Sequence, residues 1–171
     1  MTRQVEVVVH HLEMGSPDQL RPSTSEAPGI RLRRVDPDDA PAAARACYAL
    51  VGGPWHWTDR RDLDDDGWRD LLDREAGEVW VARDGESVAG YFQLARQEQD
   101  IAIHYFGLAP THIGRGIGGW LLTRAVERAW ALGPRRVVLN TCTLDGPAAL
   151  PNYLARGFSI AREEHRTREL D

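Results

Sequence analysis

The stretch Gly107-Leu-Ala-Pro-Thr-His-Ile-Gly-Arg-Gly-Ile-Gly-Gly-Trp-Leu-Leu122 decides the fold of this chain. An apolar run ends there, four glycines occupy the six positions from Gly114 to Gly119, and an amphipathic pattern begins at once. Glycine permits positive φ and a close approach of backbone to a ligand. The first turn of a helix adds unpaired N–H groups and the positive end of a dipole. The stretch therefore predicts a strand, a loop and a helix whose N-terminus binds phosphate.

The residues around this stretch predict a mixed α/β domain. Three strands precede it, at 78–83, 87–95 and 101–108, and the Asp84-Gly85 turn makes them an antiparallel meander. After it, the pattern predicts a helix to about Leu132, a strand at 136–142, a short helix with Asp145 as its cap, and a strand from Phe158 to about Arg166.

The first half of the chain predicts two further strands and two helices. The strands are expected at 4–13 and 30–35, with a loop at 15–29 between them. Asp36 or Asp38 is the expected cap of a helix to about Leu50, and Asp65 or Asp66 that of a second helix. Residues 1–29 are thus interpreted as an N-terminal strand and loop extension of a domain at 30–171.

Composition limits the partners of this protein. The chain has 171 residues, enough for one domain, and its net charge of −5 argues against nucleic acid as a partner. No apolar run approaches the ~20 residues that span a bilayer, so no membrane partner is expected. With two cysteines and no metal-ligand pattern, we expect a cytoplasmic, disulfide-free protein without a metal. Oligomeric state is left open, with a homodimer among the alternatives.

The glycine segment has four possible interpretations. Gly114-x-Gly116-x-x-Gly119 formally matches a dinucleotide fingerprint, but the match comes late in the chain and no acid follows at 134–142. A nucleotide P-loop would need a Gly-Lys-Ser/Thr that is absent. A turn that serves only close packing is disfavoured, because four glycines that open a helix are costly without a ligand. The fourth reading is coenzyme A.

Two motifs resemble the GNAT (GCN5-related) N-acetyltransferases. Residues 108–122 resemble their acyl-CoA motif, Arg/Gln-x-x-Gly-x-Gly/Ala, although Ile113 stands at the Arg/Gln position. Residues 145–158 resemble their ending, Asn-x-x-Ala-x-x-x-Tyr-x-x-x-Gly-Phe, with Tyr153 and Gly157-Phe158 in place and Gly146 where Asn is common. The motifs stand in the required order, and the resemblance covers about residues 30–171.

The resemblance implies a GNAT fold of the α+β type. This is a mixed, mostly antiparallel central sheet flanked by helices, in which the fourth and fifth strands splay apart around the pantetheine arm of acetyl-CoA. Counted from Ile30, those strands are 101–108 and 136–142. The implied cofactor-binding residues are Leu108, Ala109, Ile113, Gly114, Arg115, Gly116, Ile117, Gly118, Gly119 and Asn152. Most of that grip would come from backbone N–H groups.

The resemblance also assigns catalytic roles. The backbone N–H of Leu108 would polarise the thioester carbonyl, and Gly107 would permit a local bulge. Tyr153 would act as general acid toward the leaving thiolate, which it would assist without being indispensable. Many members place a Glu on the fourth strand as base, but the position here is about Ala102. Asp100 and His104 lie two residues to either side; we favour His104, because neutral histidine is available near pH 7. A water chain is the third alternative for the base.

The segment Val51-Gly-Gly-Pro-Trp-His-Trp-Thr-Asp59 predicts the acceptor pocket. In the GNAT fold, the segment after the first helix commonly walls the acceptor site. An aromatic wall of Trp55, His56 and Trp57 beside Asp59 would suit an amine cation, although a plug at the sheet edge is an equal alternative. The resulting prediction is an acetyl-CoA-dependent N-acetyltransferase that acts on a small-molecule or peptide amine. The alternative is a GNAT-like module that senses acyl-CoA without turnover.

Overall fold

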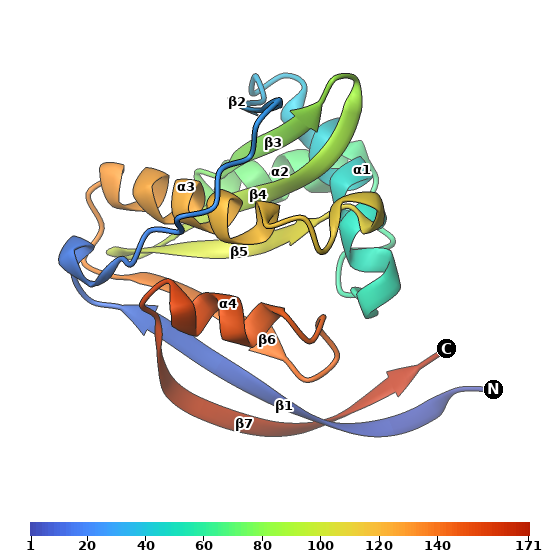
Figure 1. The fold of residues 1–171 in the computed structure, drawn as a ribbon. Coiled ribbons are helices and arrows are strands. Elements are labelled where there is room, and N and C mark those ends of the chain that lie inside the picture. The colour runs from blue at the N-terminus through green and yellow to red at the C-terminus, as the bar shows by residue number, and fades with distance from the viewer.

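A seven-stranded sheet runs through the molecule in the order β2-β3-β4-β5-β6-β1-β7 (Figure 1). The computed structural model describes all residues from Met1 to Asp171. The strands are β1 (Arg3–Met14), β2 (Ile30–Arg34), β3 (Glu78–Asp84), β4 (Ser87–Gln97), β5 (Asp100–Leu108), β6 (Val137–Cys142) and β7 (Ser159–Leu170). Only β5 and β6 pair in parallel, so the sheet is mixed and mostly antiparallel, which confirms the predicted fold class.

Helices cover both faces of the sheet. They are α1 (Ala40–Gly52), α2 (Asp65–Glu75), α3 (Ile117–Ala131) and α4 (Ala149–Ala155), with short 3-10 turns η1 (Pro17–Gln19), η2 (Gly53–Trp55) and η3 (Pro110–His112). One core cluster joins α3 to Phe92 and Leu94, and the other joins α1 and α2 to Val81 and Tyr91. Alternate residues of β4 therefore serve opposite cores, as the period of a strand requires. None of these helices has the length and apolarity needed to cross a bilayer.

The caps of two helices differ from the expectation. The N-cap of α2 is Asp64, whose Oδ1 accepts the Gly67 N–H at 2.8 Å, and not Asp65 or Asp66. The N-cap of α1 is Asp39, and its side chain makes no capping bond. Because several aspartates stand side by side before each helix, the local pattern alone does not select among them.

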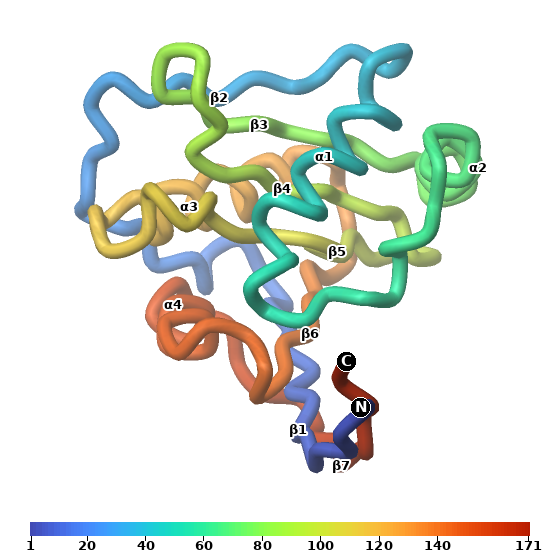
Figure 2. Tube along the Cα trace, turned by 90° about the vertical axis from the view of Figure 1, so that its right-hand side faces the viewer, coloured from blue at the N-terminus to red at the C-terminus, as the bar shows by residue number.

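β5 and β6 separate after a short parallel contact. Their pairing is limited to Ile101 with Val137 and Ala102 with Val138. Beyond these pairs the strands diverge, and α3 and α4 lie on the same side of the sheet (Figures 1 and 2). This geometry is the splayed pair that the sequence predicted for 101–108 and 136–142.

The N-terminal strand lies inside the sheet. Residues Val9–Met14 of β1 pair with β6, and Arg3–Glu13 pair with β7 on the other side. Arg3–Val8 pair with β7 alone, opposite His165–Leu170. These two segments form a two-stranded arm that carries both chain ends away from the helices (Figure 2). The boundary expected at residue 29 stays a prediction.

Candidate active site

A cavity of about 840 Å³ lies between the separated ends of β5 and β6. One group of its lining residues comes from the end of β5 and the starts of α3 and α4, and a second comes from β6 and the loop after it. A third group comes from the loop after α1 and from the arm. The predicted site residues in the lining are Trp55, Trp57, Asp59, His104, Leu108, Ile113, Gly118, Asn152 and Tyr153. The others are outside the lining: His56, Ala109, Gly114, Arg115, Gly116, Ile117 and Gly119.

The backbone N–H of Leu108 points toward the cavity. The Ala109 N–H donates to the Ala89 carbonyl at 2.8 Å, and Leu108 stands opposite Gly90. In an antiparallel pair the bonds to one neighbour alternate along the strand, so the Leu108 N–H is directed away from β4. On that side lies β6, which no longer pairs with β5 at this level. The donor is therefore available to a ligand that enters between the strands.

The glycine loop leaves backbone N–H groups at the start of α3. Gly114 and Gly116 have φ values of 84° and 77°, which other residues rarely adopt. Gly116 is the N-cap of α3 and offers no side-chain cap. A Cβ built on Gly114 would meet nothing within 4 Å, so the loop has open space beside it. Open space and uncapped N–H groups at a long helix fit the pyrophosphate of coenzyme A.

The segment before β2 borders this loop. It crosses α3 on its way from β1 (Figure 1), and the Ser23 N–H donates to Thr123 Oγ1 at 3.0 Å. Ser25 Oγ is 3.5 Å from a Cβ built on Gly116. Arg115, the one charged side chain inside the loop, is exposed and 3.7 Å from the Asp84 carboxylate. No local pattern in residues 23–25 predicted this position.

Gly107 has a different role from the one expected. The register shift between β4 and β5 falls between Gln93 and Leu94, opposite His104, and not at Gly107. A Cβ on Gly107 would lie 2.5 Å from Val51 Cγ1 of α1. Glycine is thus needed because α1 approaches β5 closely, and not because the strand bulges there.

Tyr153 projects from α4 into the cavity. Its side chain is buried and packs edge-on against Phe106, with ring centroids 6.1 Å apart. Its hydroxyl makes no hydrogen bond to another protein group, yet it is not sealed from solvent. Burial, and then the Asp145 carboxylate, raise the pKa of Tyr153 above its ordinary value of 10.0, so the hydroxyl keeps its proton.

His104 is the extra residue of the bulge in β5. Gln93 stands opposite Tyr105 and Leu94 opposite Ile103, which leaves His104 unpaired in the ladder. Its Nδ1 lies 3.2 Å from Glu75 Oε2 at the end of α2, and its ring stacks on Tyr105 at 4.5 Å. Glu75 was not foreseen, because helix-end glutamates are common and the pair spans 29 residues.

Asp100 belongs to an ion-pair network and does not line the cavity. Its Oδ2 is 2.7 Å from Arg136 Nη2, which also pairs through Nη1 with Glu13 at 2.7 Å. Arg135 Nε lies 3.7 Å from Asp100 Oδ1. The hydrogen bond from Arg136, working against burial, lowers the pKa of Asp100 below its ordinary value. Arg135 and Arg136 thus both pair with the carboxylate at the start of β5.

The loop after α1 forms an aromatic wall around Asp59. Asp59 Oδ1 accepts the Tyr48 hydroxyl at 2.5 Å, and Oδ2 accepts the Tyr105 hydroxyl at 2.9 Å. Trp57 packs on both tyrosines, with centroid distances of 5.6 and 5.4 Å. His56 is exposed, and its backbone is in the left-handed region. Its carbonyl accepts a hydrogen bond from Arg168, and its ring does not face the cavity.

Asp145 lines the cavity, whereas the sequence pattern predicted it as a helix cap. α4 begins at Ala149, and Asp145 does not cap it. Its Oδ2 accepts the Thr141 hydroxyl at 2.6 Å and the Cys142 N–H at 3.0 Å, and its Oδ1 accepts Trp57 Nε1 at 3.3 Å. The carboxylate therefore ties the loop after β6 to the aromatic wall.

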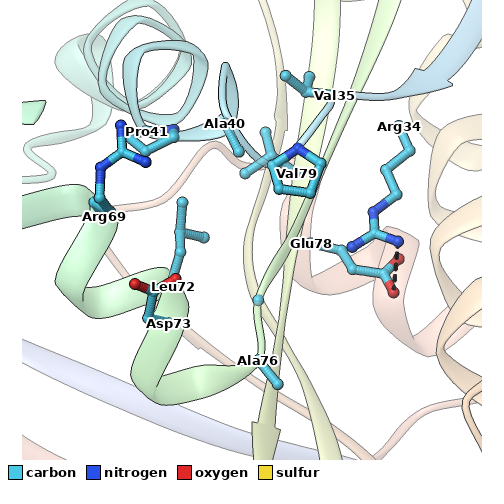
Figure 3. Close-up of a pocket in the computed structure, with 12 residues that line it drawn as sticks. Arg34, Val35, Ala40, Pro41, Arg69, Leu72, Asp73, Ala76, Glu78 and Val79 are labelled. Carbon is cyan, nitrogen blue, oxygen red and sulfur yellow. Dashed lines mark ion pairs between the residues drawn. The ribbon is translucent and has the colours of Figure 1, made fainter.

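A second cavity, of about 300 Å³, lies between α1, α2 and β3 (Figure 3). The Glu78 carboxylate at its edge already has partners: Arg128 Nε and Nη2 at 2.9 Å, Trp80 Nε1 at 2.8 Å and Arg34 Nη1 at 3.8 Å. No predicted site residue lines this cavity. No group of three or more His, Cys, Asp and Glu residues in the structure could hold a metal ion.

Comparison with known proteins agrees with this geometry. Residues 44–158 match the model of the acetyltransferase (GNAT) family. Over 88 residues, the chain is 35% identical to the mycothiol acetyltransferase of Corynebacterium aurimucosum, covering 49% of this chain and 28% of that protein. A GCN5-related N-acetyltransferase from Sphaerobacter thermophilus has a TM-score of 0.74 at 18% identity, covering 98% of this chain and 53% of that one.

A further solved structure is an aminoglycoside acetyltransferase from an uncultured soil metagenomic sample. Its TM-score is 0.62 at 19% identity, and the match covers 75% of this chain and 87% of that one. The chain thus spans about half of the Sphaerobacter thermophilus structure and about a quarter of the mycothiol acetyltransferase.

Proposed function

This chain belongs to the GNAT acetyltransferase family, and on that premise we propose that it transfers the acetyl group of acetyl-CoA to a primary amine within a ternary complex. The observation that carries the proposal is the Leu108 N–H, which faces the gap between β5 and β6 beside the uncapped start of α3. Acetyl-CoA supplies the acetyl group as a thioester, whose carbonyl needs such a donor when it becomes an oxyanion.

Leu108 and Tyr153 act on different atoms of the thioester. Leu108 donates to the carbonyl oxygen while the amine nitrogen bonds to the carbonyl carbon, and the carbon–sulfur bond then breaks. Tyr153 donates a hydrogen bond to the departing thiolate. Because the pKa of Tyr153 is raised and that of an ordinary thiol is ~8.5, full proton transfer from Tyr153 is uphill. Its role is therefore to stabilise the thiolate, which later takes a proton from solvent.

His104 accepts the proton that the attacking amine releases. Glu75 holds its Nδ1, which leaves Nε2 as the accepting atom in the matching tautomer. His104 precedes Leu108 by four residues, roughly 13 Å along an extended strand, so the proton passes through water within the cavity. A module that only senses acyl-CoA is not favoured, since the matched family and the relative from Corynebacterium aurimucosum are acetyltransferases.

The test combines binding of acetyl-CoA with release of free thiol across a panel of primary amines. Gly118 lies in the first turn of α3, and a Cβ there would sit 3.7 Å from Leu108 Cδ1. We expect Gly118→Val to weaken acetyl-CoA binding by at least about tenfold, because the larger side chain enters the cavity. Gly29→Asn, at an open left-handed position outside the cavity, is the control and should leave binding unchanged.

Two results would contradict the proposal. Unchanged calorimetric affinity in Gly118→Val would place acetyl-CoA elsewhere. Tight binding of acetyl-CoA without thiol release on any amine would leave the chain a binding module.

A further inference from the structure

The charged side chains that line the cavity are not all neutralised by the protein. The five charged or titratable side chains in the lining are Asp59, His104, Asp145, Arg166 and Arg168. Two of them, His104 and Arg166, already contact a carboxylate of the protein. Arg166 donates from Nη2 and Nε to Glu164 Oε2 at 2.6 and 2.9 Å, and His104 is held by Glu75.

Arg168 differs because only neutral groups hold it. Its Nη2 donates to the His56 carbonyl at 2.9 Å and to Thr58 Oγ1 at 3.1 Å. No carboxylate lies within the 4.0 Å of an ion pair with it, although every other arginine of β7 has one. The guanidinium is half-buried and fixed in direction, and its full charge remains for a ligand.

Two carboxylates of the same cavity are in the converse situation. Asp59 is held by the hydroxyls of Tyr48 and Tyr105, and Asp145 is held by a hydroxyl, an amide and an indole. Neutral donors orient these oxygens without cancelling their charge. Thr58, which holds Arg168 of β7, is the neighbour of Asp59 in the chain, so a positive and a negative group line the same part of the cavity.

We propose that Arg168 binds an oxyanion of the acceptor, and that the acceptor is therefore a zwitterion, an amine that also carries a carboxylate or a similar group. The inference rests on the proposed acyl transfer and names the substrate class of the same site. A guanidinium presents a planar fork of donors that matches a carboxylate. Asp59 and Asp145 attract the ammonium end before it loses its proton. A simple alkylamine carries no group that accepts from the Arg168 guanidinium.

The test uses acceptor pairs that differ only in the anion. ω-Aminohexanoate is compared with ω-aminohexanamide, and ω-aminobutanoate with ω-aminobutanamide, because the amine is remote from the altered group. We expect KM for each acid to be about tenfold lower than for its amide. Arg168→Gln, which keeps a donor for the loop but removes the charge, should abolish that preference, so that KM for each acid comes within about twofold of KM for its amide in the same variant.

The matched control is Arg162→Gln. Arg162 lies on the same strand, is exposed and pairs with Glu164 outside the cavity. It should retain the preference for acids. Equal KM values for acid and amide in the native protein, or a preference that survives Arg168→Gln, would overturn the proposal and leave Arg168 as a structural link between the arm and the loop.

Calorimetry of the same acids in the presence of coenzyme A separates this inference from the proposed function. Binding of the acids that depends on Arg168, without thiol release on any amine, would uphold the anion site and contradict acyl transfer. Equal thiol release with acids and amides would uphold acyl transfer and contradict the anion site.

Discussion

At the scale of single residues, the hydroxyl of Tyr153 decides whether α4 takes part in the chemistry. It is the one cavity hydroxyl on that helix, and it lacks a protein partner. Because this hydroxyl lines the cavity and is not sealed from solvent, it is free to donate a hydrogen bond to a ligand bound there.

Replacing Tyr153 with Phe should lower kcat about tenfold and leave acetyl-CoA affinity unchanged, because only the hydrogen bond to the thiolate is lost. Thiol-release assays measure kcat, and calorimetry measures the affinity for acetyl-CoA. Tyr91→Phe is the control, since it removes a fully buried hydroxyl that also lacks a partner but lies outside the cavity. Equal turnover in Tyr153→Phe and the native protein would make Tyr153 a packing residue only.

Sequence pattern identified residues whose role depends on neighbours in the chain. The glycine loop, Leu108 and Tyr153 stand at fixed offsets within motifs, and Leu108 and Tyr153 line the cavity as expected. Residues that act through distant partners were missed or misassigned. Asp145 resembles a cap because it precedes Pro147, whereas it accepts hydrogen bonds from the end of β6 and from Trp57, which is 88 residues away. Arg168 gives no local signal at all.

At the scale of elements, a buried ion cluster joins β3 to α3. Glu78 is 6% exposed, and Arg128 of α3 donates two bonds to it and also lies over the Trp80 ring at 5.5 Å. Burial alone would raise the pKa of Glu78, but the bonds from Arg128 and Trp80 and the charge of Arg34 outweigh burial and lower it below 4.5. The ionised form is thus stabilised in the folded state.

Glu78→Gln should lower the free energy of unfolding by about 2 kcal/mol at pH 7. A carboxyl whose folded pKa is depressed contributes its stability above the unfolded pKa and loses it as pH falls through the folded value. The difference between Glu78→Gln and the native protein should therefore shrink below pH 4.5, the ordinary value for this group. Denaturant unfolding at several pH values measures it.

The exposed Glu86 provides the comparison, and Glu86→Gln should change stability by less than about 0.5 kcal/mol. A Glu78→Gln penalty that stayed constant from pH 7 to pH 3 would show that lost packing, and not charge, was responsible.

Elements were predicted better than the pairing between them. Hairpin turns, helix starts and apolar periods are local, so the strands and helices were found within a few residues. The bulge at His104 was not found, because an extra residue in a strand has no compositional mark. The bulge matters for the site, since it removes His104 from the ladder beside the cavity.

At the scale of the whole molecule, the unexpected feature is the place of β1. The sequence predicted a strand at its position but could not assign neighbours, because strand order depends on contacts between residues more than 100 positions apart. In the structure β1 joins β6 to β7, so the wall of the cavity that carries Arg168 is attached to the rest of the sheet only through the N-terminal strand. The first residues of the chain thereby support the wall of the cavity that contains Arg168.

This arrangement predicts that the interior of β1 matters more than its arm. Leu12 is 2% exposed in the core cluster with α3, whereas Val5 lies half-buried in the arm. Leu12→Ala should cost about 3 kcal/mol of unfolding free energy, within the range for buried leucines, and Val5→Ala about 1 kcal/mol or less. Urea unfolding followed by tryptophan fluorescence measures both. If Leu12→Ala cost no more than Val5→Ala, β1 would be an appended strand that the sheet does not need, and the acceptor wall would depend on β7 and the loop after α1 alone.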